Sequence, residues 1–206
     1  MKVPRLTGKT IFMRTTIMTL CFLVSVGMSG QINAEHLEVG QQAPRIKATD
    51  QNGKSIDSKV ILENEKILLV FYRGNWCPHC KKHLGELEKN LTALKEKGVF
   101  VLVVTPESVE KTKETQEKFN TSFSIVHDSG NQIMKDYKVA FEVNESNVPN
   151  YYDKITELVD EYNSESEKAL PVPATYLIGT DERIEYVQYD PDYKNRSDIS
   201  EIVISL

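Results

Sequence analysis

Cysteine is scarce in this chain of 206 residues, which contains only Cys21, Cys77 and Cys80. Cys21 lies in an N-terminal stretch with the features of a removable targeting segment, so the mature chain would keep a single pair. A disulfide between Cys77 and Cys80 would close a loop of only four residues and remove little chain entropy. The pair cannot join distant parts of the fold, and it favours redox chemistry over a disulfide scaffold.

Long apolar runs are absent as well. The apolar stretch of residues 17–28 covers only 12 residues and includes Thr19, Ser25 and Gly27, which is too short for a membrane span. Basic but no acidic side chains precede it, and Ile32-Asn33-Ala34 fits a cleavage end. We therefore predict that residues 1–34 form a signal peptide, with Met13 as an alternative start.

The targeting segment predicts an exported protein that is periplasmic or extracytoplasmic. After signal removal we expect no stable membrane span. An uncleaved anchor is the alternative interpretation of the same apolar stretch.

The chain also has no excess of positive charge. The chain carries 25 basic and 30 acidic residues, a formal net charge of −5. Residues 1–34 hold four of the basic residues and none of the acidic ones, so residues 35–206 carry 21 against 30, a net of −9. Nucleic-acid binding depends on cations that neutralise phosphate, so we expect no nucleic-acid partner. The acidic residues are dispersed, which is typical of a solubilising surface.

The apolar pattern predicts an α/β fold with a mixed central sheet flanked by helices, an N-terminal hairpin extension and a helical insertion. The hairpin turn is expected at Asn52-Gly53, and the insertion at about residues 141–169, which are rich in polar side chains. Strands are expected at residues 66–72, 99–104, 123–126, 174–178 and 184–189. Helices are expected from Pro78 to Gly98 and at residues 107–120, 131–137, 151–162 and 198–206.

The most informative motif is Trp76-Cys77-Pro78-His79-Cys80. It follows an apolar strand and precedes leucines at helical spacing, so both cysteines fall on the first turn of a helix, where proline is tolerated. The unpaired N–H groups and the dipole of the helix N-terminus stabilise a thiolate there. We therefore expect Cys77, at the N-cap, to be the more exposed sulfur and the nucleophile in disulfide exchange. Cys80, which leans toward the core, would then resolve the mixed disulfide.

Two other chemistries compete for this motif. Zinc could bind Cys77, Cys80 and His83, but a structural site needs four ligands, usually from two pairs, and the mature chain has no further cysteine. Covalent haem is excluded because Lys81 rather than histidine follows Cys80. We therefore expect no cofactor and no metal.

A second informative feature is Val172-Pro173, just before an apolar strand. In a thioredoxin-like fold, a cis-proline before the last parallel strand faces the helix that carries the cysteines. We therefore expect a cis bond before Pro173 and a Val172 backbone that is presented to an extended substrate. The alternative is a loop proline that only ends the insertion. Trp76 is either a substrate contact beside the cysteines or a packing residue.

The chain resembles the peroxiredoxin-like branch of the AhpC/TSA family, which has a thioredoxin fold. The resemblance extends over residues 39–206 and implies that residues 35–206 form a thioredoxin-like domain. It also implies a thiol-based antioxidant enzyme that is recycled by a thioredoxin-type donor. The segments that carry it are residues 71–80, Thr105-Pro106-Glu107, Leu170-Pro171-Val172-Pro173-Ala174-Thr175-Tyr176 and Asp190-Pro191-Asp192-Tyr193.

The chain departs from the peroxiredoxin active-site pattern Pro-x-x-x-Thr-x-x-Cys. In this alignment Arg73 replaces the proline, Cys77 the threonine and Cys80 the peroxidatic cysteine, while Pro173 replaces an arginine before a later strand. Two polar groups that polarise peroxide are therefore missing, although Arg73 could supply a cation nearby. We expect peroxidase activity that is slow or absent.

Two functional hypotheses follow, with opposite roles for the cysteines. In the peroxiredoxin-like hypothesis, the Cys80 thiolate attacks a hydroperoxide, and the resulting sulfenic acid condenses with Cys77. In the alternative, an exported thioredoxin-like protein exchanges disulfides with other proteins, and Cys77 attacks first. Arg73, Trp76, Val172 and Pro173 are the expected substrate-binding residues in both. A binding domain that has merely kept the fold is a third, non-enzymatic interpretation.

Overall fold

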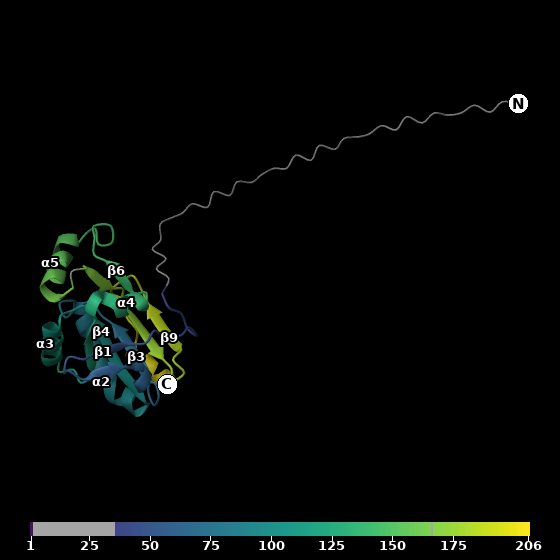
Figure 1. Cartoon of the computed structure of the whole chain (residues 1–206), viewed down its shortest axis with the longest axis horizontal. Helices are drawn as coiled ribbons and strands as arrows, with labels where there is room; N and C mark the ends of the chain where they lie inside the picture. Colours follow the sequence, from purple (N-terminus) through teal and green to yellow (C-terminus); the bar gives the residue numbers. More distant parts are fainter. Residues whose placement is uncertain (2–35, 166) are drawn as a thin grey trace. The chain divides into compact units, whose positions relative to one another are not determined.

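A computed structural model of the chain describes Met1, residues 36–165 and residues 167–206. The predicted signal peptide therefore lies outside the described residues. None of the helices in the described part is both long enough and apolar enough to cross a membrane. Residues 36–165 and 167–206 belong to one compact unit, which is shown in Figure 1.

The unit alternates strands and helices, as the apolar pattern predicts. The strands are β1 (Lys47–Thr49), β2 (Ser55–Asp57), β3 (Lys66–Phe71), β4 (Val99–Thr105), β5 (Ser124–His127), β6 (Ala140–Glu142), β7 (Ala169–Pro171), β8 (Ala174–Ile178) and β9 (Ile184–Tyr189). The helices are α1 (Ser58–Ile61), α2 (Pro78–Glu96), α3 (Val109–Phe119), α4 (Gln132–Asp136), α5 (Tyr152–Tyr162) and α6 (Ile199–Ser205), with a short 3-10 turn at Ser129–Asn131.

Five strands form the central sheet in the order β5-β4-β3-β8-β9. β3 pairs in parallel with β4, and β4 with β5, whereas β8 runs antiparallel to both β3 and β9. The sheet is therefore mixed, which confirms the predicted fold class. The Asn52-Gly53 turn joins β1 and β2 in a separate antiparallel hairpin, as expected, and Gly53 adopts the positive φ of 81° that this turn requires.

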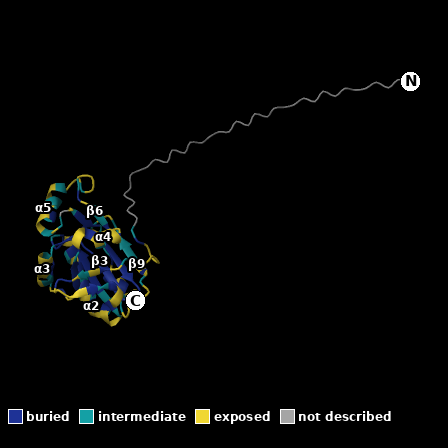
Figure 2. Cartoon of the chain, viewed as in Figure 1, coloured by how far each residue is buried: buried dark blue, intermediate teal, exposed yellow. Residues whose placement is uncertain are grey.

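The central strand β3 is buried on both faces, and Figure 2 shows the strands of the sheet as the buried centre of the unit. Alternate side chains enter two separate apolar clusters, because successive residues of a strand point to opposite faces. Ile67, Leu69 and Phe71 pack with residues from α4 and the N-terminal hairpin. Leu68 and Val70 pack against the leucine stripe of α2 and against α6. The leucine spacing thus places α2, and its cysteines, on one defined face.

The predicted insertion contains the predicted helix, α5, together with a feature that the sequence did not reveal. Its two ends pair as the antiparallel strands β6 and β7. Val143, Val159 and Leu170 form a small buried cluster beneath it. Trp76 packs both against this cluster and against the cluster that holds the cysteines. The insertion is therefore in apolar contact with the site, rather than only a solvated surface segment.

Two expectations about the segment before β8 were wrong. β8 is antiparallel to its neighbour β3, so Pro173 does not precede a parallel strand. None of the peptide bonds in residues 36–165 and 167–206 is cis, so the bond before Pro173 is trans. The backbone is held in this form from both sides, because the Val172 N–H donates to the Val139 carbonyl at 2.8 Å and Ala174 already pairs with Phe71.

Candidate active site

The two cysteines lie at the N-terminus of α2, as the motif predicts. Cys77 is the N-cap residue, with an extended backbone, and Pro78 occupies the first helical turn. The Cys77 carbonyl accepts the Lys81 N–H at 3.0 Å, which closes the first turn, and the Cys77 N–H donates to the Gly74 carbonyl at 3.1 Å. Both cysteines are free thiols. The backbone therefore places both sulfurs on one helical turn, the arrangement that a reversible disulfide requires.

Both sulfurs are buried, and Cys77 is the more exposed of the two only by a small margin. Cys77 is 2% exposed and Cys80 0% exposed. Their proton affinities nevertheless differ. The pKa of Cys77 is lowered to about 5, chiefly by the hydrogen bond with the Cys80 side chain. Burial opposes this shift, whereas the Cys80 N–H and the cations of Arg73 and Arg196 contribute to it. Burial raises the pKa of Cys80, and the neighbouring Cys77 sulfur raises it more. At neutral pH the thiolate is therefore on Cys77.

Arg73 brings a buried cation to the site. It is 5% exposed, and its guanidinium carbon lies 5.3 Å from the ring centre of Trp76 and 5.1 Å from that of Tyr193. Arg73 Nε and Trp76 Nε1 are both buried without a hydrogen-bond partner among the described residues. Burial lowers the pKa of Arg73, while the cysteine sulfurs and Tyr193 oppose this shift. The cation is thus held by two aromatic faces and keeps a donor free near the sulfurs.

Residues 190–197, which we call the cover segment, place a second cation against the cysteine pair. Arg196 Nη2 lies 3.7 Å from the Cys80 sulfur, and Arg196 also donates to the Tyr193 carbonyl. The Tyr193 ring meets the His79 ring edge-on at 5.6 Å. The cover segment therefore packs against the start of α2, beside Cys80.

Buried hydroxyls fix the end of the cover segment. Ser197 Oγ lies 2.9 Å from Thr175 Oγ1 on β8 and 3.1 Å from His83 Nε2 on α2. Burial, assisted by the Arg196 charge, lowers the pKa of His83 to about 4, so its ring is neutral at pH 7. Residues 36–165 and 167–206 contain no group of three His, Cys, Asp or Glu side chains placed to hold a metal ion.

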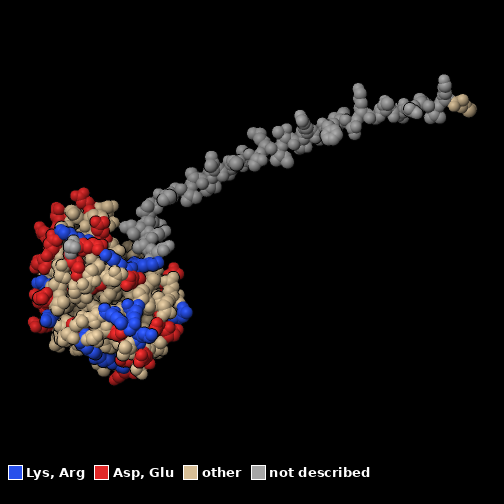
Figure 3. Space-filling view, viewed as in Figure 1, with Lys and Arg blue, Asp and Glu red and all other residues tan. Residues whose placement is uncertain are grey.

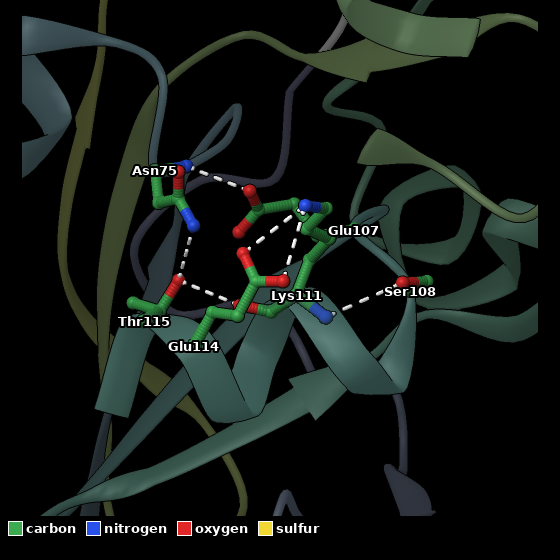
Figure 4. Close-up of polar contacts among 6 residues, drawn as sticks. All are labelled: Asn75, Glu107, Ser108, Lys111, Glu114 and Thr115. Carbon is green, nitrogen blue, oxygen red and sulfur yellow. Dashed lines mark hydrogen bonds and ion pairs between the residues drawn. The ribbon is translucent and has the colours of Figure 1, made fainter. Parts of the chain in front are cut away.

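A buried carboxylate, Glu107, supports the loop before Cys77 (Figure 4). Its Oε1 accepts the Asn75 N–H at 2.8 Å, and its Oε2 accepts the Tyr72 hydroxyl at 2.5 Å. The Asn75 amide donates to Thr115 Oγ1 at 3.1 Å, which ties the same loop to α3. Burial raises the pKa of Glu107 to about 7, although both hydrogen bonds oppose the shift. The conformation of residues 73–77 thus depends on a carboxyl group that titrates near neutrality.

Val172 and Pro173 lie at the same edge of the sheet as the cysteine loop. Phe71, the last residue of β3, pairs with Ala174, the first residue of β8. Residues 72–77 and 172–173 therefore leave adjacent strands at one edge. Pro173 is buried and Val172 is half-buried. Their position is compatible with a substrate-binding role, which remains a prediction.

Sequence reasoning missed three contributors to the site. Glu107 and Tyr193 belong to segments that carry the family resemblance, but no role was attached to them. Arg196 follows 116 residues after Cys80 and has no motif around it. A signal did exist for Glu107, because an acidic side chain between a buried strand and a helix N-cap is a candidate for a buried carboxylate.

Comparison with protein families identifies the chain. The sequence model of the AhpC/TSA family matches residues 39–187, more than half of the chain. The chain belongs to the AhpC/TSA family. Among curated relatives of this family member, the thiol-disulfide oxidoreductase ResA of Bacillus thuringiensis subsp. konkukian is 29% identical over 106 residues. That match covers 51% of this chain and 60% of the relative. The peroxiredoxin Bcp of Escherichia coli is 26% identical over 163 residues, which cover 79% of this chain and 92% of the relative.

Solved structures show the same fold. The peroxidoxin BcpB of Mycobacterium tuberculosis matches with a TM-score of 0.62 at 16% identity, and the match covers 82% of this chain and 96% of that protein. A putative protein disulfide isomerase from Bacteroides thetaiotaomicron matches with a TM-score of 0.56 at 16% identity, over 82% and 87% of the two chains. The thioredoxin-like peroxiredoxin fold predicted for this AhpC/TSA protein is confirmed.

Proposed function

We propose that this AhpC/TSA protein is a peroxiredoxin-like thiol oxidoreductase that cycles Cys77 and Cys80 between dithiol and disulfide. The observation that carries the proposal is the opposite direction of the two pKa shifts. A thiolate at Cys77 and a protonated thiol at Cys80 supply an attacking sulfur and a resolving sulfur within one helical turn. This order of attack is the reverse of the one implied by aligning Cys80 with the peroxidatic cysteine.

With a hydroperoxide as oxidant, the reaction has two chemical steps. The Cys77 thiolate attacks the terminal peroxide oxygen, the O–O bond breaks, and the alkoxide leaves and takes a proton. The Cys80 thiol then attacks the Cys77 sulfenic acid, an S–S bond forms, and water leaves. Arg73 Nε, which has no partner among residues 36–165 and 167–206, and Arg196 support this step because they can stabilise charge on the leaving oxygen. Two electrons from an external thiol donor, of the thioredoxin type or smaller, reopen the disulfide.

A second candidate is disulfide exchange with protein substrates. It is favoured by the low pKa of Cys77 at a helix N-terminus, and the curated relative ResA is named a thiol-disulfide oxidoreductase. In this reaction Cys77 attacks a substrate disulfide, and Cys80 then displaces the reduced substrate. Both candidates use the same attacking sulfur, so they differ in the oxidant rather than in the roles of the cysteines.

Stopped-flow consumption of hydrogen peroxide by the reduced protein separates the two candidates. The expected result is a rate well above that of free cysteine, which is lost in Cys77→Ser. The Cys80→Ser variant should retain a single turnover and leave a sulfenic acid that dimedone traps on Cys77. A rate no greater than that of free cysteine, together with mixed disulfides that accumulate on Cys77 in Cys80→Ser, would replace peroxide reduction with disulfide exchange.

The site of action follows from the sequence and belongs to the same proposal. Residues 1–34 have the pattern of a signal peptide, so the oxidoreductase would act outside the cytoplasm, in the periplasm or an equivalent compartment. A thioredoxin-type donor there would have to be exported or membrane-bound. Fractionation of cells that express the full chain tests this, and recovery of the uncleaved chain in the cytoplasm would contradict it.

A further inference from the structure

A cavity of about 730 Å³ lies directly beside the cysteine helix, between α2 and the cover segment. Its volume is within the range of sites for small molecules. Of the eleven residues that line it, only Ile199 is apolar. Such a lining suits a small hydrophilic ligand and does not suit an acyl chain or another apolar group.

The cavity has an excess of positive charge. Lys82, on α2, and Lys194 and Arg196, on the cover segment, bring cations to it from two sides. Within residues 36–165 and 167–206, neither Lys82 nor Lys194 forms an ion pair with a carboxylate. The exposed half of the cavity is therefore a place where anionic groups would be attracted.

The acidic groups of the same cavity are already engaged. Glu86 accepts Lys89 Nζ at 2.8 Å, and Lys89 does not line the cavity. Asp198 caps α6, where its carboxylate accepts the N–H groups of Ser200 and Glu201. Three cations thus face two carboxylates that are already hydrogen-bonded, which favours a ligand that carries at least one carboxylate.

Two of the lining residues also flank the sulfurs. Arg196 Nη2 lies 3.7 Å from the Cys80 sulfur, and His79 stands between the two cysteines in the motif. The cavity therefore ends against the groups that enclose the redox pair. A ligand with a carboxylate bound by the exposed lysines would have its other end toward Arg196 and His79, beside the cysteines.

We propose that this cavity binds a low-molecular-weight thiol, or the corresponding disulfide, that carries carboxylates, and that this compound exchanges with the Cys77–Cys80 pair. The proposal rests on the thiol oxidoreductase function above and names a substrate class for it. It adds a small anionic thiol as an electron donor, distinct from a protein of the thioredoxin type.

The exchange balances in both directions. In reduction, one thiolate attacks the Cys77–Cys80 disulfide and forms a mixed disulfide on Cys77, while Cys80 leaves as a thiolate and takes a proton. A second thiolate attacks the ligand sulfur of the mixed disulfide, and Cys77 leaves. The net reaction converts one protein disulfide and two small thiols into one protein dithiol and one small disulfide. The reverse reaction oxidises the protein through the same mixed disulfide.

The test uses three disulfides of similar size and different charge on the reduced protein. These are 3,3′-dithiodipropionate with two carboxylates, bis(2-hydroxyethyl) disulfide with none, and cystamine with two ammonium groups. The rate at which each disulfide oxidises the protein is followed by Trp76 fluorescence. It is then divided by the rate at which the same disulfide reacts with 2-mercaptoethanol, which removes differences in intrinsic reactivity. The expected order is anionic, then neutral, then cationic, and the anionic preference should shrink as salt is added.

The variant Lys82→Gln/Lys194→Gln removes two of the cavity cations. The ratio of anionic to neutral rates should fall about tenfold, since one partly exposed ion pair changes an equilibrium constant by up to about fivefold. The matched control is Lys81→Gln/Lys95→Gln, which makes the same change in net charge on α2 at residues that do not line the cavity. The control should keep the wild-type ratio.

The outcomes separate this proposal from the function on which it rests. Equal normalised rates for all three disulfides, all well above those of a free thiol, would keep the oxidoreductase and overturn the anionic substrate class. An equal fall of the ratio in both double variants would also overturn it, because bulk charge would then explain the preference. Rates no greater than those of a free thiol for every disulfide would instead contradict reactivity of the cysteine pair itself.

Discussion

The buried carboxylate of Glu107 predicts a specific dependence of stability on pH. Burial raises its pKa from an ordinary value of 4.5 to about 7 in the folded protein. The folded state therefore binds this proton more tightly than the unfolded state does. The resulting stabilisation is fully present below pH 4.5 and is lost as the pH rises through 7.

The magnitude follows from the size of the shift. Each pKa unit corresponds to about 1.4 kcal/mol, so ionisation of Glu107 should cost the folded state about 3 kcal/mol between pH 4.5 and pH 8. In Glu107→Gln the side chain stays neutral. Its amide oxygen can accept the Asn75 N–H, the contact shown in Figure 4, and its amide nitrogen can donate to the Tyr72 oxygen, so both contacts are retained in form.

The assay is urea unfolding at pH 5 and pH 8, monitored by the fluorescence of Trp76, the single tryptophan of the chain. The fall in the free energy of unfolding between the two pH values should be about 2.5 kcal/mol smaller in Glu107→Gln than in the wild type. Glu117→Gln removes an exposed carboxylate of α3 and should leave the wild-type fall unchanged. A difference below about 1 kcal/mol between Glu107→Gln and the wild type would refute the argument from burial.

The remaining predictions concern the site. Alkylation of Cys77 by iodoacetamide should rise with pH to half its maximum near pH 5, since the thiolate reacts; a midpoint above pH 8 would contradict the stabilised thiolate. Arg196→Gln removes a cation that lowers this pKa, so the same titration should move to higher pH, and an unmoved midpoint would exclude the contact from a role in it. Gly74→Ala should displace the Trp76 ring and shift its emission, because an added Cβ would meet the indole; Gly85→Ala, where the added carbon meets open space, should leave the emission unchanged.

The strands and helices were predictable because their signals are local. Five apolar residues in a row gave β3, a stripe of leucines gave α2, and Asn-Gly gave the first hairpin. The position of the cysteines also followed from local signals, since proline after Cys77 and helical spacing after Cys80 fix the start of α2.

The rest of the site depends on contacts between residues that are distant in sequence. Nothing in the sequence around Arg196 indicates that it reaches the sulfur of Cys80, because the sheet and α6 must be placed first. The near-complete burial of Cys77 could not be predicted for the same reason, since a helix N-terminus is exposed until another segment covers it. The direction of β8 was wrong because an apolar strand has the same pattern in either direction.

The paired strands at the base of the insertion hold its two ends side by side, with Glu142 opposite Ala169. A segment that leaves and re-enters at neighbouring positions of a ladder can change in length without moving the strands that hold the rest of the molecule. Residues 143–168 should therefore accept replacement by a shorter or longer segment, such as an inserted peptide or reporter. Because the indole of Trp76 packs against this segment, each such replacement would change the packing beside the redox centre.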